Sequence, residues 1–520
     1  MNSSLNAALA AVCARQPDAP AIWYLDQTIS WRELDSRIGH VAAGFRRLGI
    51  GRGDVVSLWL PNTPAWLISF FALARIGAIA LATNTRFRSA ELQDILLRAK
   101  VKALIYWPEY RGIDFKEVLQ EVRPRLPDLH HVIEYHEAGD ASGALSYADL
   151  EAGSDSLADE SGPDTQCLLF TTSGTTSKPK LVLHVQGRIV THSKEAAANF
   201  GYSWPGARSL QMVPFCGTYG FIQGMATVFS GAPMSLHHGY DAALAGRLIR
   251  EHGITLTGMT DEMIRRLFQH EQEKVPFPHT RFYVGTRGHE LMELAAERGF
   301  RLAGVYGSSE VHALFARRRD DDPPEVRGFG GGPPVSANAK LRARDQETGA
   351  ILPHGQPGEI EISSPTLFVR YLHDEEATAR AFTTDGYFRT GDLGHTEADG
   401  SWSFHTRIGD AMRLSGFLVN PLEIENYVRS CPGGELCSVV GVEHQGRTVV
   451  VAFYTGQPIA EEELREYCNR NMARYKVPSR FVRVAEMPMI ASMNTPKLDR
   501  KLLRQRAAAL LAESIAQTAE

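Results

Sequence analysis

The chain has 520 residues, of which 43% are hydrophobic, and a formal net charge of -5 at pH 7. This length and composition can bury a large core and predict two or more domains, and the acidic balance excludes the basic surface typical of a nucleic-acid-binding protein. The six cysteines are scattered without a CxxC pair, which argues against a zinc site or disulfide framework and favours reduced thiols in a cytoplasmic protein.

Along the first ~400 residues, apolar runs alternate with amphipathic stretches, which predicts an α/β architecture. Residues 55–60 form a predicted strand, and residues 242–252 form a predicted helix that leads into a strand at 254–256. The most apolar window spans residues 66–83, but Arg75 interrupts it and it is short for a membrane span. It therefore predicts a buried helix with a following strand, and no membrane span.

The sequence pattern changes in the last third of the chain. Residues 340–344 and 358–362 predict short strands around a turn at 347–349. Around residues 407–416 the pattern changes again, and a compact α+β segment follows that ends in a helix rich in Lys and Arg. We therefore expect a large N-terminal domain, residues 1–406, of helix-flanked β-sheets with a β-rich subdomain, and a small α+β C-terminal domain, residues 407–520.

One loop concentrates groups that bind phosphate. Residues 171–180 read Thr-Thr-Ser-Gly-Thr-Thr-Ser-Lys-Pro-Lys and lie between the apolar runs 167–170 and 181–183. Hydroxyls, backbone N–H groups near a glycine and ammonium groups are the donors that a polyphosphate needs. The loop is not a Walker A motif, because no second glycine precedes a Lys-Ser or Lys-Thr pair. It predicts a polyphosphate site, with a polar surface loop as the alternative.

Four further segments follow this loop in a fixed order. They are Tyr-Gly-Ser-Ser-Glu at 306–310, Gly-Tyr-Phe-Arg-Thr-Gly-Asp-Leu at 386–393, Thr-Arg-Ile-Gly-Asp at 406–410 and Asn-Thr-Pro-Lys-Leu-Asp-Arg at 494–500. Together with the loop they resemble the adenylate-forming superfamily of acyl-CoA synthetases, adenylation domains and luciferases. The resemblance covers nearly the whole chain, and five motifs in order are far more specific than any one of them.

The resemblance implies a site for ATP with Mg²⁺. Glu310 would ligate Mg²⁺, Ser309 would bond the α-phosphate and Tyr306 would pack on the adenine. Asp392 would accept both ribose hydroxyls, and Arg407 would reach the same sugar. The residues implied for the β- and γ-phosphates are Thr172, Ser173, Gly174, Thr175, Thr176 and Lys180. The residues implied near the adenine are Thr286 and Arg287.

The resemblance also implies a catalytic lysine and a moving domain. Lys497 would stabilise the charges that converge when a carboxylate attacks the α-phosphate of ATP; a surface lysine in a basic tail is the alternative. In this family the small C-terminal domain rotates between the two half-reactions, which implies a hinge at 407–410. The family pattern is not followed at Ser177 in the phosphate loop, at Gly409 in the hinge or at Pro496 before the lysine.

The acyl pocket is expected to combine aromatic and small residues. Its candidates are Phe215, Gly217, Tyr219, Phe221 and Tyr283. Acyl-CoA synthetases often have a histidine or an aromatic residue where this chain has Gly217. The glycine leaves either volume at the carboxylate end or room for a close approach of the backbone. The set suits an aryl acid or a medium-to-long acyl chain.

The leading prediction is an acid–thiol ligase, that is, an AMP-forming acyl-CoA synthetase. ATP would activate a small-molecule carboxylic acid as an acyl-adenylate with release of pyrophosphate, and CoA would capture the acyl group. The alternative is an adenylating enzyme of a natural-product pathway that passes the group to a carrier-protein thiol or an amine. A non-catalytic nucleotide-binding relative is disfavoured, because all five expected site residues are present. They are Lys180, Glu310, Asp392, Arg407 and Lys497. The identity of the acid and the oligomeric state stay open, with a homodimer as one alternative.

Overall fold

Strands and helices alternate along most of the chain. The computed structural model describes residues 3–110, 114–137, 145–153, 155–172, 179–285, 290–414, 417–444, 447–472, 474–490 and 497–516. Contacts between Cα atoms divide the chain into two units. The first comprises Met1–Lys340, Ile362–Phe388 and Asp399–Ser401, and the second comprises Leu341–Glu361, Arg389–Ala398 and Trp402–Glu520. The predicted domain boundary at residue 407 stays a prediction.

A seven-stranded sheet of the first unit carries the two apolar runs that flank the predicted phosphate loop. Its order is β18-β8-β7-β4-β3-β5-β6, and it is parallel from β7 to β6, with β8 and β18 added in antiparallel fashion. The predicted strand at 55–60 is confirmed as β3. The bounds are β3 (Val55–Trp59), β4 (Ile79–Ala82), β5 (Val101–Tyr106), β6 (His131–Glu134), β7 (Gln166–Thr171), β8 (Leu181–Val185) and β18 (Arg370–Tyr371).

The eight-stranded sheet of the first unit carries the Tyr-Gly-Ser-Ser-Glu motif at one edge. Its order is β14-β13-β12-β11-β9-β10-β1-β2, with antiparallel pairs only at the two ends. The bounds are β1 (Pro20–Tyr24), β2 (Gln27–Ser30), β9 (Ser209–Gln211), β10 (Met234–Leu236), β11 (Leu256–Gly258), β12 (Arg281–Val284), β13 (Arg301–Ser308) and β14 (His312–Arg317).

Many helices of the first unit begin at a side-chain cap. Ser30, Thr63 and Asp241 each accept a hydrogen bond from the backbone N–H three residues on, which satisfies a donor that the first helical turn leaves unpaired. The bounds are α1 (Leu5–Arg15), α2 (Trp31–Arg47), α3 (Pro64–Arg75), α4 (Ser89–Arg98), α5 (Phe115–Val122), α6 (Tyr147–Glu151), α7 (Gln186–Phe200), α8 (Thr218–Ser230), α9 (Ala242–Glu251), α10 (Asp261–His270), α11 (Glu290–Arg298), α12 (Pro324–Arg327) and α13 (Glu375–Ala381).

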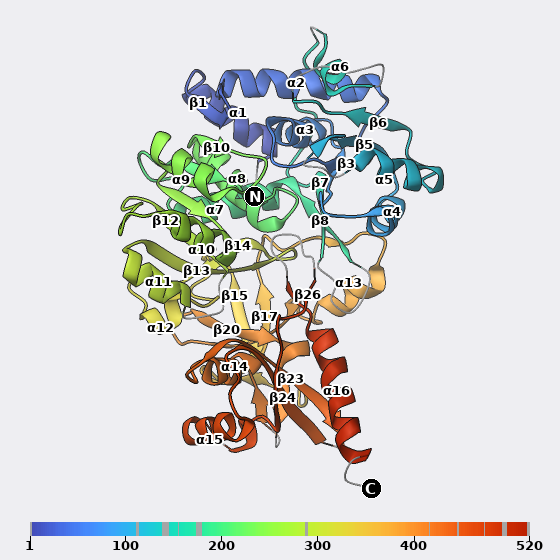
Figure 1. The fold of residues 1–520 in the computed structure, drawn as a ribbon. Coiled ribbons are helices and arrows are strands. Elements are labelled where there is room, and N and C mark those ends of the chain that lie inside the picture. The colour runs from blue at the N-terminus through green and yellow to red at the C-terminus, as the bar shows by residue number, and fades with distance from the viewer. Residues whose placement is uncertain are drawn as a thin grey trace. The chain divides into compact units, whose positions relative to one another are not determined.

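The apolar window at 66–83 folds as expected. All residues of α3 are buried, and β4 follows it. The helix lies beneath α2 and beside β3 (Figure 1). Its one charged residue, Arg75, donates to the Asn6 side chain at 3.0 Å and to Asp35 at 2.5 Å, so the buried guanidinium is paired. In the described part of the chain, no helix combines the length and apolar character that a bilayer crossing requires.

Helix α8 joins the cores of the two large sheets. The Phe221 ring lies 5.4 Å from the Phe170 ring of the seven-stranded sheet. On the other side, the Gln223 side chain donates to the Leu210 carbonyl of the eight-stranded sheet at 2.7 Å. Buried aromatic rings therefore fill the space around this helix, and they position its N-terminus at Gly217.

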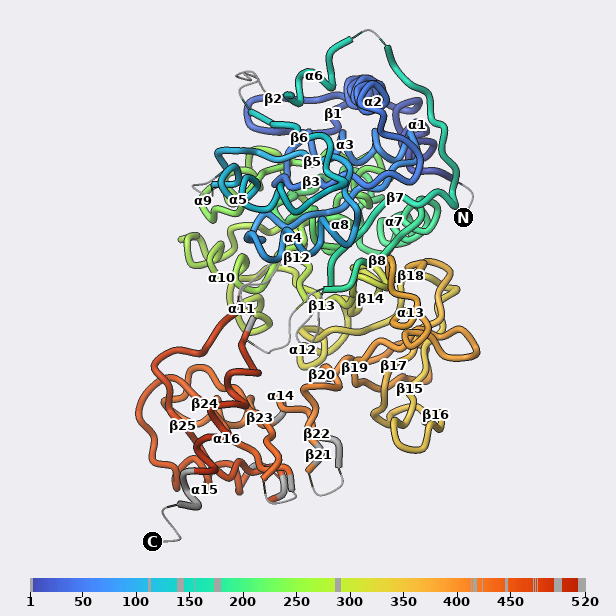
Figure 2. The backbone as a smooth tube through the Cα atoms, turned by 90° about the vertical axis from the view of Figure 1, so that its right-hand side faces the viewer, coloured from blue at the N-terminus to red at the C-terminus, as the bar shows by residue number. Residues whose placement is uncertain are grey.

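The second unit contains the small α+β part. Its first sheet has the order β16-β15-β17-β19-β20, and a second sheet pairs β23, β24 and β25. Helix α16 runs beside β23 (Figure 2). Leu503 and Leu511 of the helix belong to one hydrophobic core with Val440 of β23 and Val451 of β24. The bounds are β15 (Lys340–Arg344), β16 (Ile351–Leu352), β17 (Gly358–Ser363), β19 (Phe388–Thr396), β20 (Trp402–Arg407), β21 (Met412–Leu414), β22 (Phe417–Val419), β23 (Gly434–His444), β24 (Arg447–Gly456), β25 (Arg480–Arg483), β26 (Met489–Ile490), β27 (Lys497–Leu498), α14 (Pro421–Arg429), α15 (Glu461–Asn471) and α16 (Arg500–Ala516).

Candidate active site

The predicted phosphate loop connects two paired strands. β7 and β8 are antiparallel, and Thr172 and Lys180 close the pair at the base of the loop. The backbone N–H of Thr172 donates to the Lys180 carbonyl at 3.0 Å, and the N–H of Lys180 donates to the Thr172 hydroxyl at 2.9 Å. The predicted ligands Ser173, Gly174, Thr175 and Thr176, and Ser177 with them, lie outside the described residues. The hairpin therefore fixes the two ends of the loop.

The Tyr-Gly-Ser-Ser-Glu motif spans the end of β13 and the start of the turn to β14, with Ser309 and Glu310 in the turn. Glycine is required at 307, because a Cβ atom there would overlap the backbone of Ala313 on the paired strand. The Tyr306 side chain is buried, with its ring 6.4 Å from that of Phe315. The Ser308 hydroxyl accepts from the N–H of Glu310 at 3.2 Å, which shapes the turn that presents Ser309 and Glu310.

Tyr371 of β18, which is not among the predicted site residues, connects this turn with Lys180. Its hydroxyl donates to Glu310 Oε1 at 3.0 Å, and Lys180 Nζ lies 4.4 Å from the centroid of its ring. Strand pairing produces this arrangement, because Tyr371 pairs with Val182, two residues after Lys180. No sequence signal marks Tyr371, since 61 residues separate it from Glu310.

Three buried histidines stand behind the same turn. The rings of His184 and His192 lie 4.3 and 4.8 Å from the ring of His312. His184 Nε2 bonds the Ser309 carbonyl at 2.9 Å, and His192 Nε2 bonds the Ala313 carbonyl at 2.8 Å. A carbonyl can only accept, so Nε2 carries the proton in both rings.

Burial keeps these rings neutral. Desolvation lowers the pKa of His184 to about 3 and that of His192 to about 4, and it lowers the pKa of His312 well below its usual value. Neutral imidazoles can stack without charge repulsion. The backbone of the turn at 309–313 is therefore held by uncharged donors from β8 and α7.

Within the second unit, Asp392 and Arg407 form a cross-strand pair. They are direct neighbours in the β19–β20 register, and Arg407 Nε lies 2.9 Å from Asp392 Oδ1. Asp392 is 1% exposed, whereas about half of the Arg407 side chain is exposed. Arg407 also donates to the Thr390 carbonyl at 2.9 Å. The guanidinium therefore holds the backbone that leads into Asp392 as well as its carboxylate.

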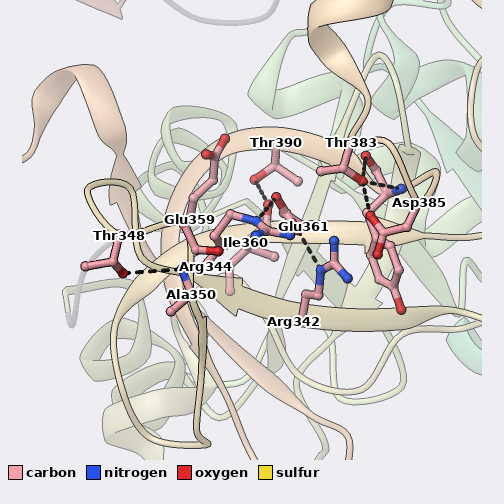
Figure 3. Close-up of polar contacts among 12 residues, drawn as sticks. Arg342, Arg344, Thr348, Ala350, Glu359, Ile360, Glu361, Thr383, Asp385 and Thr390 are labelled. Atoms are coloured by element: carbon pink, nitrogen blue, oxygen red, sulfur yellow. Dashed lines mark hydrogen bonds and ion pairs between the residues drawn. The ribbon is translucent and has the colours of Figure 1, made fainter.

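The neighbouring strand β17 supports this pair. The Thr390 hydroxyl donates to the Ile360 carbonyl at 2.6 Å and accepts from the N–H of Asp392 at 3.0 Å. The next residue of β17, Glu361, is fully buried and receives bonds of 2.6 Å from both Arg342 and Arg344 (Figure 3). Charge-assisted bonds of this kind are strong and geometrically specific. Hydrogen bonds to β17 therefore hold the strand that carries Asp392 in place.

The acyl-pocket candidates cluster around the N-terminus of α8. Phe215 and Phe221 pack on Trp66, with ring centroids 5.0 and 6.1 Å away. The Tyr219 hydroxyl donates to the Tyr283 carbonyl at 2.6 Å, and the Tyr283 hydroxyl donates to the Phe200 carbonyl at 2.6 Å. Gly217 precedes the helix as its N-cap residue. The structure therefore gathers all five candidates in one region.

The remaining predicted residues are the catalytic lysine, the two residues expected near the adenine and the hinge. Lys497 begins strand β27, where it pairs with Ile490. Thr286, Arg287 and Pro496 lie outside the described residues. At the expected hinge, Arg504 of α16 donates to the Gly409 carbonyl at 2.8 Å and to Asp410 at 3.0 Å.

Comparison with known proteins identifies the family. The sequence model of the AMP-binding enzyme family matches residues 9–372, and that of its C-terminal domain matches residues 423–494. The chain belongs to the AMP-binding enzyme family. The predicted resemblance to adenylate-forming enzymes and the predicted fold class are confirmed.

Individual relatives resemble the chain over most of its length. One is a CoA ligase of Mycobacterium tuberculosis, named for a methyl-dioxo-octahydroindenyl propanoyl group, which is 29% identical over 95% of this chain and 97% of the relative. The salicyl-AMP ligase / salicyl-S-ArCP synthetase of the same organism is 28% identical over 91% of this chain and 85% of its own. ATP-bound MatB from Rhodopseudomonas palustris shares the fold, with a TM-score of 0.85 at 24% identity over 97% of this chain and 99% of MatB.

These matches confirm the predicted enzyme class. The chain is an AMP-forming acid–thiol ligase, which activates a carboxylic acid as an acyl-adenylate at the expense of ATP and then transfers the acyl group to CoA.

Proposed function

We propose that this chain carries out acyl-CoA synthesis with the residues that its motifs predict. The observation that supports this most directly is the contact of Tyr371 with both Lys180 and Glu310. It joins the base of the predicted phosphate loop to the predicted Mg²⁺ ligand, two motifs that are 130 residues apart in the numbering. A phosphate ligand and a metal ligand must be neighbours if both are to serve one MgATP.

The residues around Glu310 fit a magnesium ion. Mg²⁺ usually keeps several waters and binds through one or two carboxylates together with substrate phosphates. Glu310 offers one carboxylate, and its Oε1 accepts a hydrogen bond from a neutral hydroxyl rather than from a cation. When bound, Mg²⁺ supplies positive charge that stabilises the negative charge of the phosphates.

The remaining roles follow from the charge of each group. Lys180 and the loop at 172–176 would hold the β- and γ-phosphates, and Ser309 would bond the α-phosphate. Asp392 would accept the ribose hydroxyls, with Arg407 beside it. Lys497 would stabilise the charges of the carboxylate and the α-phosphate as they approach, which is the main way in which protein groups accelerate such a step.

We further propose that residues 407–520 move between the two half-reactions, with the hinge at 407–410. Gly409 supports this, because glycine has the widest backbone freedom of any residue. The acyl pocket would be built from Phe215, Gly217, Tyr219, Phe221 and Tyr283, and would take an aryl acid or a medium-to-long acyl chain. The cytoplasmic location stays a prediction.

The deciding experiment measures pyrophosphate release with ATP and Mg²⁺ across aryl and fatty acids, with and without CoA. We expect sustained turnover only when CoA is present, with the best acid defining the substrate class. Turnover that is indifferent to CoA would instead favour a carrier protein or an amine as acceptor. One relative, named a salicyl-S-ArCP synthetase, gives that alternative a specific basis.

Lys497→Ala separates the two half-reactions. Adenylation should fall by about a thousandfold, because a preorganised positive charge is lost from the transition state. Thioester formation from a preformed acyl-adenylate and CoA should stay within about twofold, since Lys497 acts only before the adenylate exists. The check is single-turnover kinetics of each half-reaction, with Lys501→Ala in the following helix α16 as the control. Equal loss in both halves would contradict the assigned role.

A further inference from the structure

Tyr371 contacts two groups of opposite charge with two different parts of one side chain. The ring faces the Lys180 ammonium, with Nζ 4.4 Å from its centroid, and the hydroxyl donates to Glu310 Oε1 at 3.0 Å. Both residues are described, and no ion pair joins Lys180 to Glu310. The two charges are therefore held near each other without pairing.

We propose that Tyr371 is a positioning residue for adenylation that keeps Lys180 and Glu310 in place while preventing them from pairing. The inference rests on the proposed roles of these two residues toward phosphate and Mg²⁺. An ammonium and a carboxylate in direct contact neutralise each other, so the lysine would lose attraction for phosphate and the carboxylate for Mg²⁺. An aromatic face attracts an ammonium and leaves it charged, and a neutral hydroxyl orients a carboxylate without cancelling its charge.

The surroundings of Tyr371 are rigid enough for this role. The side chain is 3% exposed, and its ring lies 4.8 Å from that of Phe368. β18 pairs with β8, and the N–H groups of Val369 and Leu372 each donate at 2.8 Å to carbonyls of β8. The strand therefore keeps a fixed distance from the residue that follows Lys180.

The same segment also fixes the backbone of Glu310. The N–H of Phe368 donates to the Glu310 carbonyl at 2.8 Å. Glu310 is thus bound twice by residues 368–371, once at its backbone and once at its carboxylate. The backbone bond comes from Phe368, and the Tyr371 side chain contributes the hydroxyl bond to the carboxylate. A side chain that only filled space would not need that bond, which is why we assign Tyr371 a role in positioning.

Two substitutions separate the two parts of the side chain. Tyr371→Phe keeps the ring that faces Lys180 and removes the hydroxyl, whereas Tyr371→Leu removes both. Calorimetry would measure the binding of ATP under two conditions. Affinity in EDTA depends on the contact of Lys180 with phosphate, and the increase in affinity with added Mg²⁺ depends on Glu310. For Tyr371→Phe we expect unchanged binding in EDTA and about a tenfold higher Mg²⁺ concentration for half-saturation, because a hydrogen bond to a charged group is lost.

For Tyr371→Leu we expect binding of ATP in EDTA to fall by about tenfold as well, because Lys180 can now pair with Glu310. Adding Glu310→Gln to Tyr371→Leu should restore most of this loss, since it removes the competing carboxylate. With Tyr371 intact, Glu310→Gln should leave binding in EDTA nearly unchanged. Purely additive effects of the two substitutions would overturn the inference.

Tyr106→Phe is the matched control. The Tyr106 hydroxyl also donates to a glutamate, Glu134 Oε1, at 2.9 Å, and the side chain is 2% exposed. Its loss should lower the thermal unfolding midpoint about as much as Tyr371→Phe does, without altering the Mg²⁺ dependence. If the two variants match in both measurements, Tyr371 is only structural and the inference fails. If the unmodified enzyme shows no Mg²⁺-dependent binding of ATP, the proposed function itself fails, and this inference with it.

Discussion

Glu310 and Asp392 are the two carboxylates that the motifs predict in the ATP site. The residues around them differ in charge. Glu310 accepts a hydrogen bond from a neutral tyrosine hydroxyl at 3.0 Å. Asp392 is almost fully buried and lies 2.9 Å from an arginine guanidinium. The first carboxylate keeps its net negative charge, whereas the second is balanced by a fixed cation.

The difference shows how similar carboxylates become suited to different ligands. A carboxylate without a cationic partner attracts a metal ion, whose charge it can help to balance. A carboxylate paired with arginine has little net charge to offer, but its oxygen lone pairs still accept hydrogen bonds from hydroxyls. The partner residue, rather than the carboxylate, therefore distinguishes the proposed metal ligand from the proposed ribose ligand.

The largest effect of a substitution is expected at Glu310. Glu310→Gln keeps the size of the side chain and can still accept from Tyr371, but it removes the charge. We expect adenylation to fall by about a thousandfold, because electrostatic stabilisation at the phosphates is lost. Pyrophosphate release over a range of Mg²⁺ concentrations would measure this. Glu134→Gln, which alters a carboxylate that also accepts from a buried tyrosine, is the control and should leave the Mg²⁺ dependence unchanged.

A smaller effect is expected at Asp392. Asp392→Asn removes the charge that pairs with Arg407 and one acceptor for the sugar, so affinity for AMP should fall by about a hundredfold. The loss should be the same with and without Mg²⁺, unlike the loss at Glu310. Calorimetry with AMP and with 2′,3′-dideoxy-AMP provides the test. If the substitution weakens both nucleotides equally, Asp392 does not act on the ribose.

Acid should affect the region behind Glu310 through its neutral histidines. Burial lowers the pKa of His192 to about 4. At a pH between this value and the ordinary histidine pKa, the imidazole is protonated in the unfolded chain but not in the folded chain. The free energy of unfolding is therefore highest above the ordinary histidine pKa near 6.5. It falls as the pH drops toward 4, by up to about 1.4 kcal/mol per pH unit. The free energy of unfolding should therefore be lower at pH 5 than at pH 7.

His192→Gln tests this origin of the acid sensitivity. Between pH 7 and pH 5, the free energy of unfolding of the variant should fall by about 2 kcal/mol less than that of the unmodified enzyme, because one protonation of the unfolded chain is removed. Urea unfolding at the two pH values would measure the difference. His270→Gln, at an exposed position at the end of α10, should not change it. An unaltered pH dependence in His192→Gln would show that another group is responsible.

The sequence predicted much of the fold and the site residues that belong to the motifs. An apolar run predicted the strand that became β3, and the turn at 347–349 between two short runs predicted β15 and β17. The apolar window at 66–83, interrupted only by Arg75, predicted the buried α3. Each of these predictions rests on residues close together in the chain. The cap at Ser30 and the close approach at Gly307 are local in the same way, since their causes lie within a few residues.

Only the tertiary structure decided which groups surround the site residues. Tyr371 reaches Glu310 and Lys180 because β18 pairs with β8, and His184 reaches Ser309 although 125 residues separate them. Motif spacing determines which chemical groups are available, but a side chain's charge and orientation depend on partners that sheet pairing supplies. The sequence therefore determined the ligand types of this enzyme, and the packing of distant strands decided which carboxylate keeps its charge.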